Sequence, residues 1–225
     1  MGFQGQTDYF GYATDDTDLE VVSSKRTPRG LSTADAENEK GDIEARSYYG
    51  STDIYDIEVE YALKGGSIVL NTLKLGKLDT TMIVTGIDGT TSNKDWPTIT
   101  AKGVETSLTI TDVQTYTLPA VTITGKKLAQ AIGVTIDAGC KLTGSNFSAS
   151  VSLAECAPAG TTLALDVSGG EISGTNELVS VTDVCAVTVV AGWTITQEPG
   201  ADESGTAYGT GSASVNKVIS ADVQA

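Results

Sequence analysis

The chain has 225 residues, of which 29 are acidic and 14 basic, so its formal net charge is −15. This charge argues against binding to nucleic acid backbones, because an acidic surface repels phosphates and does not release the counterions condensed on the nucleic acid. A hydrophobic content of 40 % excludes a wholly disordered chain. No apolar run approaches the roughly 18 residues that a membrane-spanning helix needs.

The chain contains no histidine, which excludes Ser-His-Asp and Cys-His catalysis as well as the usual zinc sites. Its three cysteines are Cys140, Cys156 and Cys185, an odd number at irregular spacing. We interpret them as reduced, mostly buried small hydrophobic residues. The sequence therefore predicts no catalytic, cofactor-binding or metal-binding residues and no cofactor, and it favours a structural protein over an enzyme.

Residues 1–24 are polar and lack the periodicity of core-forming elements. We expect them to form an N-terminal arm that is ordered mainly by contacts with another subunit. The one cluster of cations follows directly and contains Lys25, Arg26 and Arg29. This cluster has two interpretations: a turn that faces solvent, or an inter-subunit contact that docks on the acidic face of a neighbouring copy.

Residues 42–49, 54–61 and 98–102 have the alternating pattern of half-buried strands. The clearest of these is 54–61, where Ile57, Val59 and Tyr61 are expected to share one face. Its other face carries three acids, which are Asp56, Glu58 and Glu60. Repeated around a ring, these acids would line a negative lumen through which DNA slides without sticking; the alternative is an ordinary solvated sheet face.

The second half of the chain has the same alternating pattern. Short alternating runs, each bounded by turn residues, lie at 122–124, 134–137, 148–153, 163–167, 187–190 and 193–196. Residues 67–75 fit either a short helix or a strand, and residues 126–132 fit two helical turns or a continuing strand. Helix is otherwise scarce, so we expect an all-β protein with a β-sandwich or barrel-like fold.

Segments of the two halves align weakly, since an acid-bearing strand followed by a Leu-x-Gly turn occurs at residues 57–65 and again at 136–144. This predicts two similar β-units in tandem, residues 25–110 and residues 111–225, either as separate domains or sharing one continuous sheet. The alternative is a single β-sandwich in which similar strand–turn–strand sequences recur.

Four segments in this order, at 38–44, 48–53, 54–61 and 91–100, resemble the tail-tube proteins of bacterial viruses and related tail, neck and capsid-accessory proteins. Residues 118–219 resemble a diverged second copy of the same β-unit. The resemblance implies a β-sandwich subunit with an extended arm or hairpin, which assembles into rings that stack as a hollow tube. It implies no catalytic residues.

The first hypothesis is therefore a tail-tube subunit, a non-enzymatic viral structural protein of the virion that is made in the bacterial cytoplasm. Its partners would be copies of itself and other virion proteins, with DNA passing without specific binding and no membrane contact. A capsid decoration or head–tail connector protein is the alternative within the virion. An adhesin-type surface module with immunoglobulin-like units is the alternative from another class, and it requires a secretion route. A carbohydrate-active enzyme with two carboxylates is disfavoured because few aromatic residues are available for sugar stacking.

Overall fold

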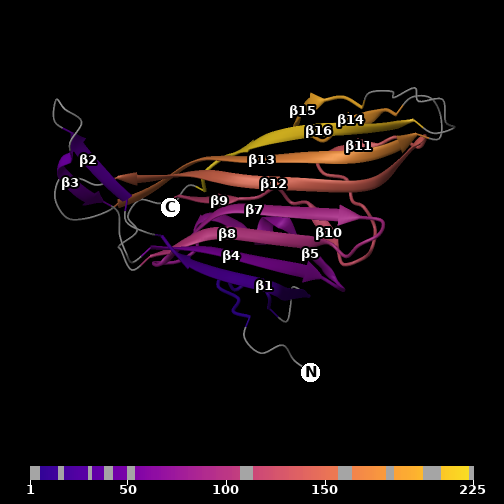
Figure 1. Ribbon diagram of the computed structural model, residues 1–225. Coiled ribbons are helices and arrows are strands. Elements are labelled where there is room, and N and C mark those ends of the chain that lie inside the picture. The colour runs from indigo at the N-terminus through magenta and orange to yellow at the C-terminus, as the bar shows by residue number, and fades with distance from the viewer. Residues whose placement is uncertain are drawn as a thin grey trace.

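A computed structural model of the chain describes residues 6–14, 18–29, 32–37, 43–49, 54–106, 114–156, 164–180, 185–199 and 209–222. The protein is all-β, as the alternating runs predict, and it is built around one large antiparallel sheet (Figure 1). The described residues contain a single short 3-10 helix, η1 (Leu70–Thr72). No helix in the described part of the chain could cross a membrane.

The main path of the large sheet contains eight strands. Their spatial order is β1 (Leu19–Pro28), β4 (Ile54–Leu63), β8 (Thr98–Thr106), β7 (Met82–Ser92), β12 (Cys140–Cys156), β13 (Ala164–Ser180), β16 (Thr210–Ile219) and β15 (Thr194–Gln197). A side branch is formed by β6 (Lys74–Lys77), which pairs with β7 and with β9 (Thr115–Thr117). Three separate two-stranded ribbons are β5 (Ser67–Val69) with β10 (Thr122–Thr124), β11 (Val134–Ile136) with β14 (Val187–Val189), and β2 (Ser32–Glu37) with β3 (Ile43–Tyr49).

Strand β7 changes its partner part of the way along its length. On the edge that faces away from β8, Ile83 and Val84 pair with β6, whereas residues 86–92 pair with β12. The register of β7 against β8 shifts between Val84 and Gly86, which marks a bulge at this position. Because a bulge bends a strand and increases its twist, the sheet divides here into the β6–β9 branch and the β12–β13 branch.

Strands β12 and β13 are the longest in the molecule and continue beyond the point where β7 turns away. Their register shifts between Ser150 and Ser152, where one residue of β12 lies opposite Gly169 and Gly170. Gly169 has a φ of +66°, a conformation that favours glycine, and a Cβ at Gly170 would lie 2.6 Å from the Tyr116 ring. Beyond this bend, the two strands project from the body as a ribbon (Figure 1).

One hydrophobic core contains residues from both halves of the chain, among them Tyr61, Leu75, Phe147, Ile172 and Val215. The predicted units 25–110 and 111–225 share this core and are joined in one sheet through β7 and β12. The order of strands away from this seam differs between the halves, being β7-β8-β4-β1 on one side and β12-β13-β16-β15 on the other. The tandem origin of the two halves stays a prediction.

The described part of the predicted N-terminal arm, residues 6–14 and 18–24, packs against the body of the protein. Phe10 and Tyr12 are buried in the core, and Leu19 begins β1. Asp8 organises the segment, because its carboxylate accepts the backbone N–H groups of residues 11 and 13. It also accepts the hydroxyl of Tyr61 at 2.5 Å. Sequence periodicity missed this segment because two isolated aromatic residues carry its packing.

Both ambiguous segments prove to be mixed or irregular. Residues 67–75 contain β5, then η1, then the start of β6. Residues 126–132 are neither helix nor strand, and hydrogen bonds of Gln130 hold them in place. The Gln130 side chain bonds both backbone groups of Thr124, and its backbone N–H donates to the Thr91 hydroxyl. Tertiary contacts therefore decide this segment, and local propensity does not.

The interpretation of the cysteines as reduced is wrong for two of them, because Cys140 and Cys185 form a disulfide with a Cα–Cα distance of 5.4 Å. Cys140 begins β12, and Cys185 lies two residues before β14. The bond therefore fastens the β11–β14 ribbon to the main sheet. Sequence spacing does not indicate the pairing, since the two residues are 45 positions apart.

Reducing this disulfide is expected to destabilise the protein. Closing a loop of this length lowers the entropy of the unfolded chain enough to contribute about 4 kcal/mol in the chain-entropy model. We expect Cys140→Ser/Cys185→Ser to lower the free energy of unfolding in urea by roughly 2–5 kcal/mol, the range typical for a lost native disulfide. Cys156→Ser is the control for thiol loss, and an equal effect of reductant on both variants would contradict the pairing.

Tyr12 and Tyr61 predict a loss of stability at alkaline pH. Burial raises the pKa of both phenols far above their usual value, and the neighbouring Asp8 charge adds to this increase. Since the unfolded phenols ionise near pH 10, the stability that they contribute is present below about pH 10 and is lost above it, by about 1.4 kcal/mol per pH unit for each tyrosine.

The double variant Tyr12→Phe/Tyr61→Phe should therefore show a flatter dependence of unfolding free energy on pH above 10. Its stability at pH 7 should fall by about 1 kcal/mol per lost hydrogen bond. Tyr9→Phe, at a partly exposed tyrosine of the same segment, is the matched control. An unchanged alkaline slope in the double variant would show that these phenols are not protected in solution.

Candidate functional site

Strand β4 separates its apolar and acidic residues onto two faces, as the alternation predicts. Ile57, Val59 and Tyr61 are buried, whereas Asp56 and Glu58 are exposed and Glu60 is partly exposed. Hydrogen bonding to β1 on one side and β8 on the other fixes this orientation. The three acids therefore lie on the solvent face of the large sheet.

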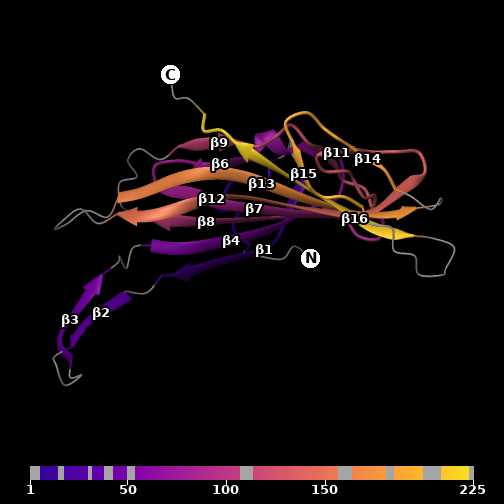
Figure 2. The ribbon, with the colours of Figure 1, turned by 90° about the horizontal axis from the view of Figure 1, so that it is seen from above.

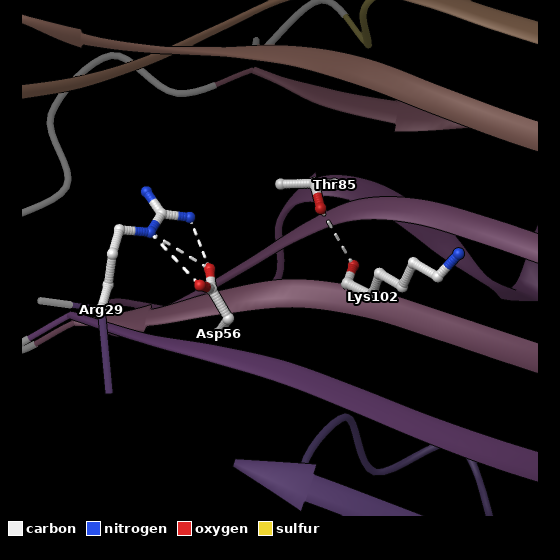
Figure 3. Close-up of polar contacts among 4 residues, drawn as sticks. All are labelled: Arg29, Asp56, Thr85 and Lys102. Carbon is white, nitrogen blue, oxygen red and sulfur yellow. Dashed lines mark hydrogen bonds and ion pairs between the residues drawn. The ribbon is translucent and has the colours of Figure 1, made fainter. Parts of the chain in front are cut away.

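The predicted cation cluster lies next to these acids because β1 runs antiparallel to β4. Lys25 is opposite Glu58 in the register, and Thr27 is opposite Asp56. Just beyond β1, the guanidinium of Arg29 holds the Asp56 carboxylate, with Nη2 at 2.5 Å and Nε at 3.2 Å from Oδ1 (Figure 3). The acidic face is thus partly neutralised by residues of its own chain.

Strand β8 brings a third cation to the same face. Lys102 is opposite Glu58 in the register and places its Nζ 2.7 Å from Oδ2 of Asp88. The hydrogen bond to Asp88 raises the pKa of Lys102, and the negative charges of Asp88 and Glu58 raise it further. At the bulge of β7, the Thr85 hydroxyl donates to the Lys102 carbonyl at 3.3 Å (Figure 3).

Arg26 does not join Lys25 and Arg29, because alternate residues of a strand point to opposite faces. Its Nε lies 2.6 Å from Oε2 of Glu105, and its guanidinium stacks 3.3 Å above the centroid of the Tyr55 ring. The hydrogen bond to Glu105 raises the pKa of Arg26. The three candidate contact residues are therefore divided between two faces of the sheet.

These side chains surround a shallow polar groove of about 620 Å³. Its charged and polar lining residues are Lys25, Thr27, Arg29, Asp56, Glu58, Thr85 and Lys102. Leu153, on the projecting part of β12, is an apolar residue of the lining. The groove can hold a polar or charged chain through hydrogen bonds and ion pairs. Among the described residues, no group of three acidic or cysteine side chains is arranged to hold a metal ion.

Sequence reasoning identified the acids and cations of β1 and β4 but missed Thr85, Lys102 and Leu153. These three residues lie on three further strands, and only the register of the sheet brings them together. An alternating Thr-Ile-Thr-Ala-Lys run at residues 98–102 was a signal that Lys102 faces outward. Nothing in the sequence indicated which strand would lie beside it.

Comparison with known proteins gives no match to a protein-family model, and none to a curated protein sequence. The resemblance to tail-tube proteins, drawn from the residues and segment order of this sequence, therefore stays a prediction. The inter-subunit role of Lys25, Arg26 and Arg29 and the lumen position of Asp56, Glu58 and Glu60 stay predictions.

Replacing Asp56, Glu58 and Glu60 by lysine tests the charge balance of this face. We expect the variant to fold, because all three side chains face solvent, but to lose about 1–3 kcal/mol of unfolding free energy. Arg29 would lose its ion pair with Asp56, and the new lysines would face Lys25 and Lys102, where like charges on neighbouring strands repel. We also expect it to bind duplex DNA in a salt-dependent way.

The matched control is Asp56→Asn/Glu58→Gln/Glu60→Gln, which removes the ion pairs without adding repulsion. Each exposed pair contributes no more than about 1 kcal/mol, so this variant should be more stable than the lysine variant. Equal urea midpoints for the two variants would show that the cations do not lie close to these positions in solution.

Proposed function

We propose that this protein is a non-enzymatic structural subunit that assembles with copies of itself, and specifically a tail-tube subunit of a bacterial virus. One observation carries this proposal: the β2–β3 hairpin stands away from the body and pairs with no other strand of the described chain. Figure 2 shows the hairpin extending from the ends of β1 and β4 into open space.

The hairpin is continuous with the sheet only at its root. The backbone N–H of Arg29 donates to the carbonyl of Ile54 at 2.8 Å, so the residues before and after the hairpin are adjacent. Beyond this root, β2 and β3 pair only with each other, from Ser32 with Tyr49 to Glu37 with Ile43. A two-stranded hairpin is at best marginally stable in water, so a partner surface would stabilise it, and a neighbouring copy can supply one.

The edges of the main sheet favour a closed assembly over unlimited sheet growth. Strand β1 ends the sheet on one side and carries a register shift after Val21, two cations and a proline. Such features discourage another strand from pairing with an edge. Strand β15 ends the other side and has only four residues. Assembly through the projecting hairpin avoids both edges, as a ring subunit requires.

In a tube of such subunits, the excess of acids over bases would repel DNA phosphates and let DNA pass without binding. Asp56, Glu58 and Glu60 are the acids that we assign to the lumen. These acids contribute less negative potential than three unpaired carboxylates would, because Arg29, Lys25 and Lys102 lie among them. The rest of the negative potential would come from the whole subunit.

The disulfide favours a second function, the adhesin-type surface module. Disulfides persist in oxidising compartments and are rare in the cytoplasm, where virion proteins are made. A secreted binding module with two β-units would contain the Cys140–Cys185 bond from the start. A virion protein would acquire this bond after release from the cell. A module of this kind would stay monomeric at high concentration, which separates the two functions.

Removing the hairpin tests the proposed function. Because Arg29 and Ile54 are adjacent, residues 30–53 can be replaced by a short Asn-Gly turn that closes β1 onto β4. We expect the shortened protein to keep its urea midpoint and to lose assembly, whereas the full chain forms rings or hollow tubes in electron microscopy and large species in light scattering.

A full-length variant with a Gly-Ser insertion between Cys156 and Ala164 is the control for altering a connection between two strands, and it should assemble. A full chain that remains monodisperse and monomeric at high concentration would contradict the proposal. That result would favour a module that acts on a shell or on a cell surface.

A further inference from the structure

Two exposed patches on the described surface combine large apolar side chains with charge, and their charges are opposite. The first, which we call the Trp96 patch, consists of Trp96, Leu128, Lys94, Lys126 and Lys127. Trp96 is 40 % exposed and Leu128 is 53 % exposed, values that are unusual for residues of their size. The ammonium of Lys127 lies 5.7 Å from the centroid of the Trp96 ring.

The loops that form the Trp96 patch are held together by Asn93. Its side chain accepts the N–H of Ala129 at 2.9 Å and donates to the carbonyl of Leu142 at 2.8 Å, while its own N–H donates to Thr143. The hydroxyl of Ser92 accepts two further N–H groups of the loop. The patch is therefore a fixed surface, so little conformational entropy would be lost on binding.

The Trp96 patch is locally basic in a strongly acidic protein. Within the described residues, no carboxylate lies within ion-pair distance of Lys94, Lys126 or Lys127, whereas Arg26, Arg29, Lys64 and Lys102 are all paired. Lys141 is exposed and directly precedes Leu142, whose carbonyl accepts a hydrogen bond from Asn93. The carboxylates nearby are Asp95, in the same loop, and Glu177, which lies against Gly144.

The second patch, which we call the Val218 patch, consists of Val218, Glu171 and Asn216. Val218 is 78 % exposed, more than any other large hydrophobic residue in the described chain. Glu171 is directly opposite it in the register of β13 and β16, is exposed, and accepts the Asn216 amide at 3.3 Å. Glu171 is opposite Ser150 of β12 in the register. Ser150 lies six residues along β12 from Gly144, which is next to the Trp96 patch. The two patches are thus separated by about 20 Å in the direction of the strands.

We propose that the Trp96 patch of one copy docks on the Val218 patch of the next copy. This inference rests on the self-assembly proposed above and names a contact for it. A net charge of −15 makes copies repel one another, so association requires a place where unpaired lysines meet a carboxylate. Two different patches on one molecule give a head-to-tail contact, and such contacts form rings when the rotation closes.

A second copy fits this surface better than a nucleic acid does. Trp96 and Leu128 gain from burial against an apolar side chain, which Val218 offers and a phosphate backbone lacks. Exposed tryptophan is also the residue type most often found to dominate protein–protein interfaces. A long polyanion would, in addition, be repelled by the acidic surface around the patch.

The test is a charge exchange between the two patches, read out by light scattering and sedimentation of the full chain. Lys127→Glu and Glu171→Lys should each weaken assembly about tenfold or more, because like charges then face each other. Mixed in equal amounts, the two variants should assemble again, since positions 127 and 171 then carry opposite charges at every contact between one variant and the other. Trp96→Ala should weaken assembly by a similar factor and leave the urea midpoint unchanged.

Lys74→Glu and Glu198→Lys make the same changes in net charge at exposed positions outside both patches and should assemble as the wild type does. Wild-type assembly with no difference between patch variants and controls would overturn this inference and leave the proposed function standing. Single variants that fail even when mixed would overturn the pairing of the two patches. Duplex DNA binding that Lys127→Glu and Trp96→Ala both abolish would identify a nucleic acid occupant instead. A wild-type chain that never assembles would remove the proposed function itself.

Discussion

The pairing of β7 with β12 along residues 86–92 is the interaction on which the rest of the structure depends. It joins strands from the two halves of the chain into one sheet and encloses one core. Gly89 makes the close approach possible, because a Cβ there would lie 2.3 Å from the Phe147 ring of the opposite strand. The aromatic ring lies over the glycine and covers the seam with apolar surface.

A buried polar cluster next to this seam fixes its register. The hydroxyls of Thr91 and Ser145 hydrogen bond across the two strands at 2.8 Å, and Ser145 donates to the Gln130 carbonyl. Asn176 holds both backbone groups of Ile132. In the described residues, no buried side-chain nitrogen or oxygen lacks a hydrogen-bond partner. Because an unsatisfied buried group is costly, a slipped register would be strongly disfavoured, and the irregular 125–132 loop would lose its support.

The sequence predicted the features that depend on local alternation. The strand at 54–61 and the faces of its residues followed from a period of two, and the scarcity of helix followed from the short runs between turn residues. Long-range pairings were not predictable in this way. The Cys140–Cys185 bond, the burial of Phe10 and Tyr12, and the position of Lys102 beside the acids of β4 all depend on which strands become neighbours. The periodicity of a single sequence does not indicate which strands become neighbours.

The difference between what local sequence predicts and what long-range strand pairing decides matters most for the distribution of charge. Read along the chain, Asp56, Glu58 and Glu60 are a bare acidic stripe, whereas in the fold Lys25, Arg29 and Lys102 stand among them. The lysines of the Trp96 patch, by contrast, come from two separate loops, residues 93–97 and 125–132, which lie together because Asn93 ties both of them to β12. An overall excess of acid can thus coexist with local surfaces of either sign, which is what selective association between like-charged molecules requires.

The root of the β2–β3 hairpin has a consequence for how such a molecule can vary. Because Arg29 and Ile54 are joined by a backbone hydrogen bond, the body of the protein is indifferent to the length of chain between them. Adding residues in matched pairs would extend the hairpin by about 3.3 Å for each residue added to both strands, with the body's own register unchanged. The reach of the arm, and with it the spacing between neighbouring molecules, can therefore drift over evolutionary time while the scaffold that carries it stays the same.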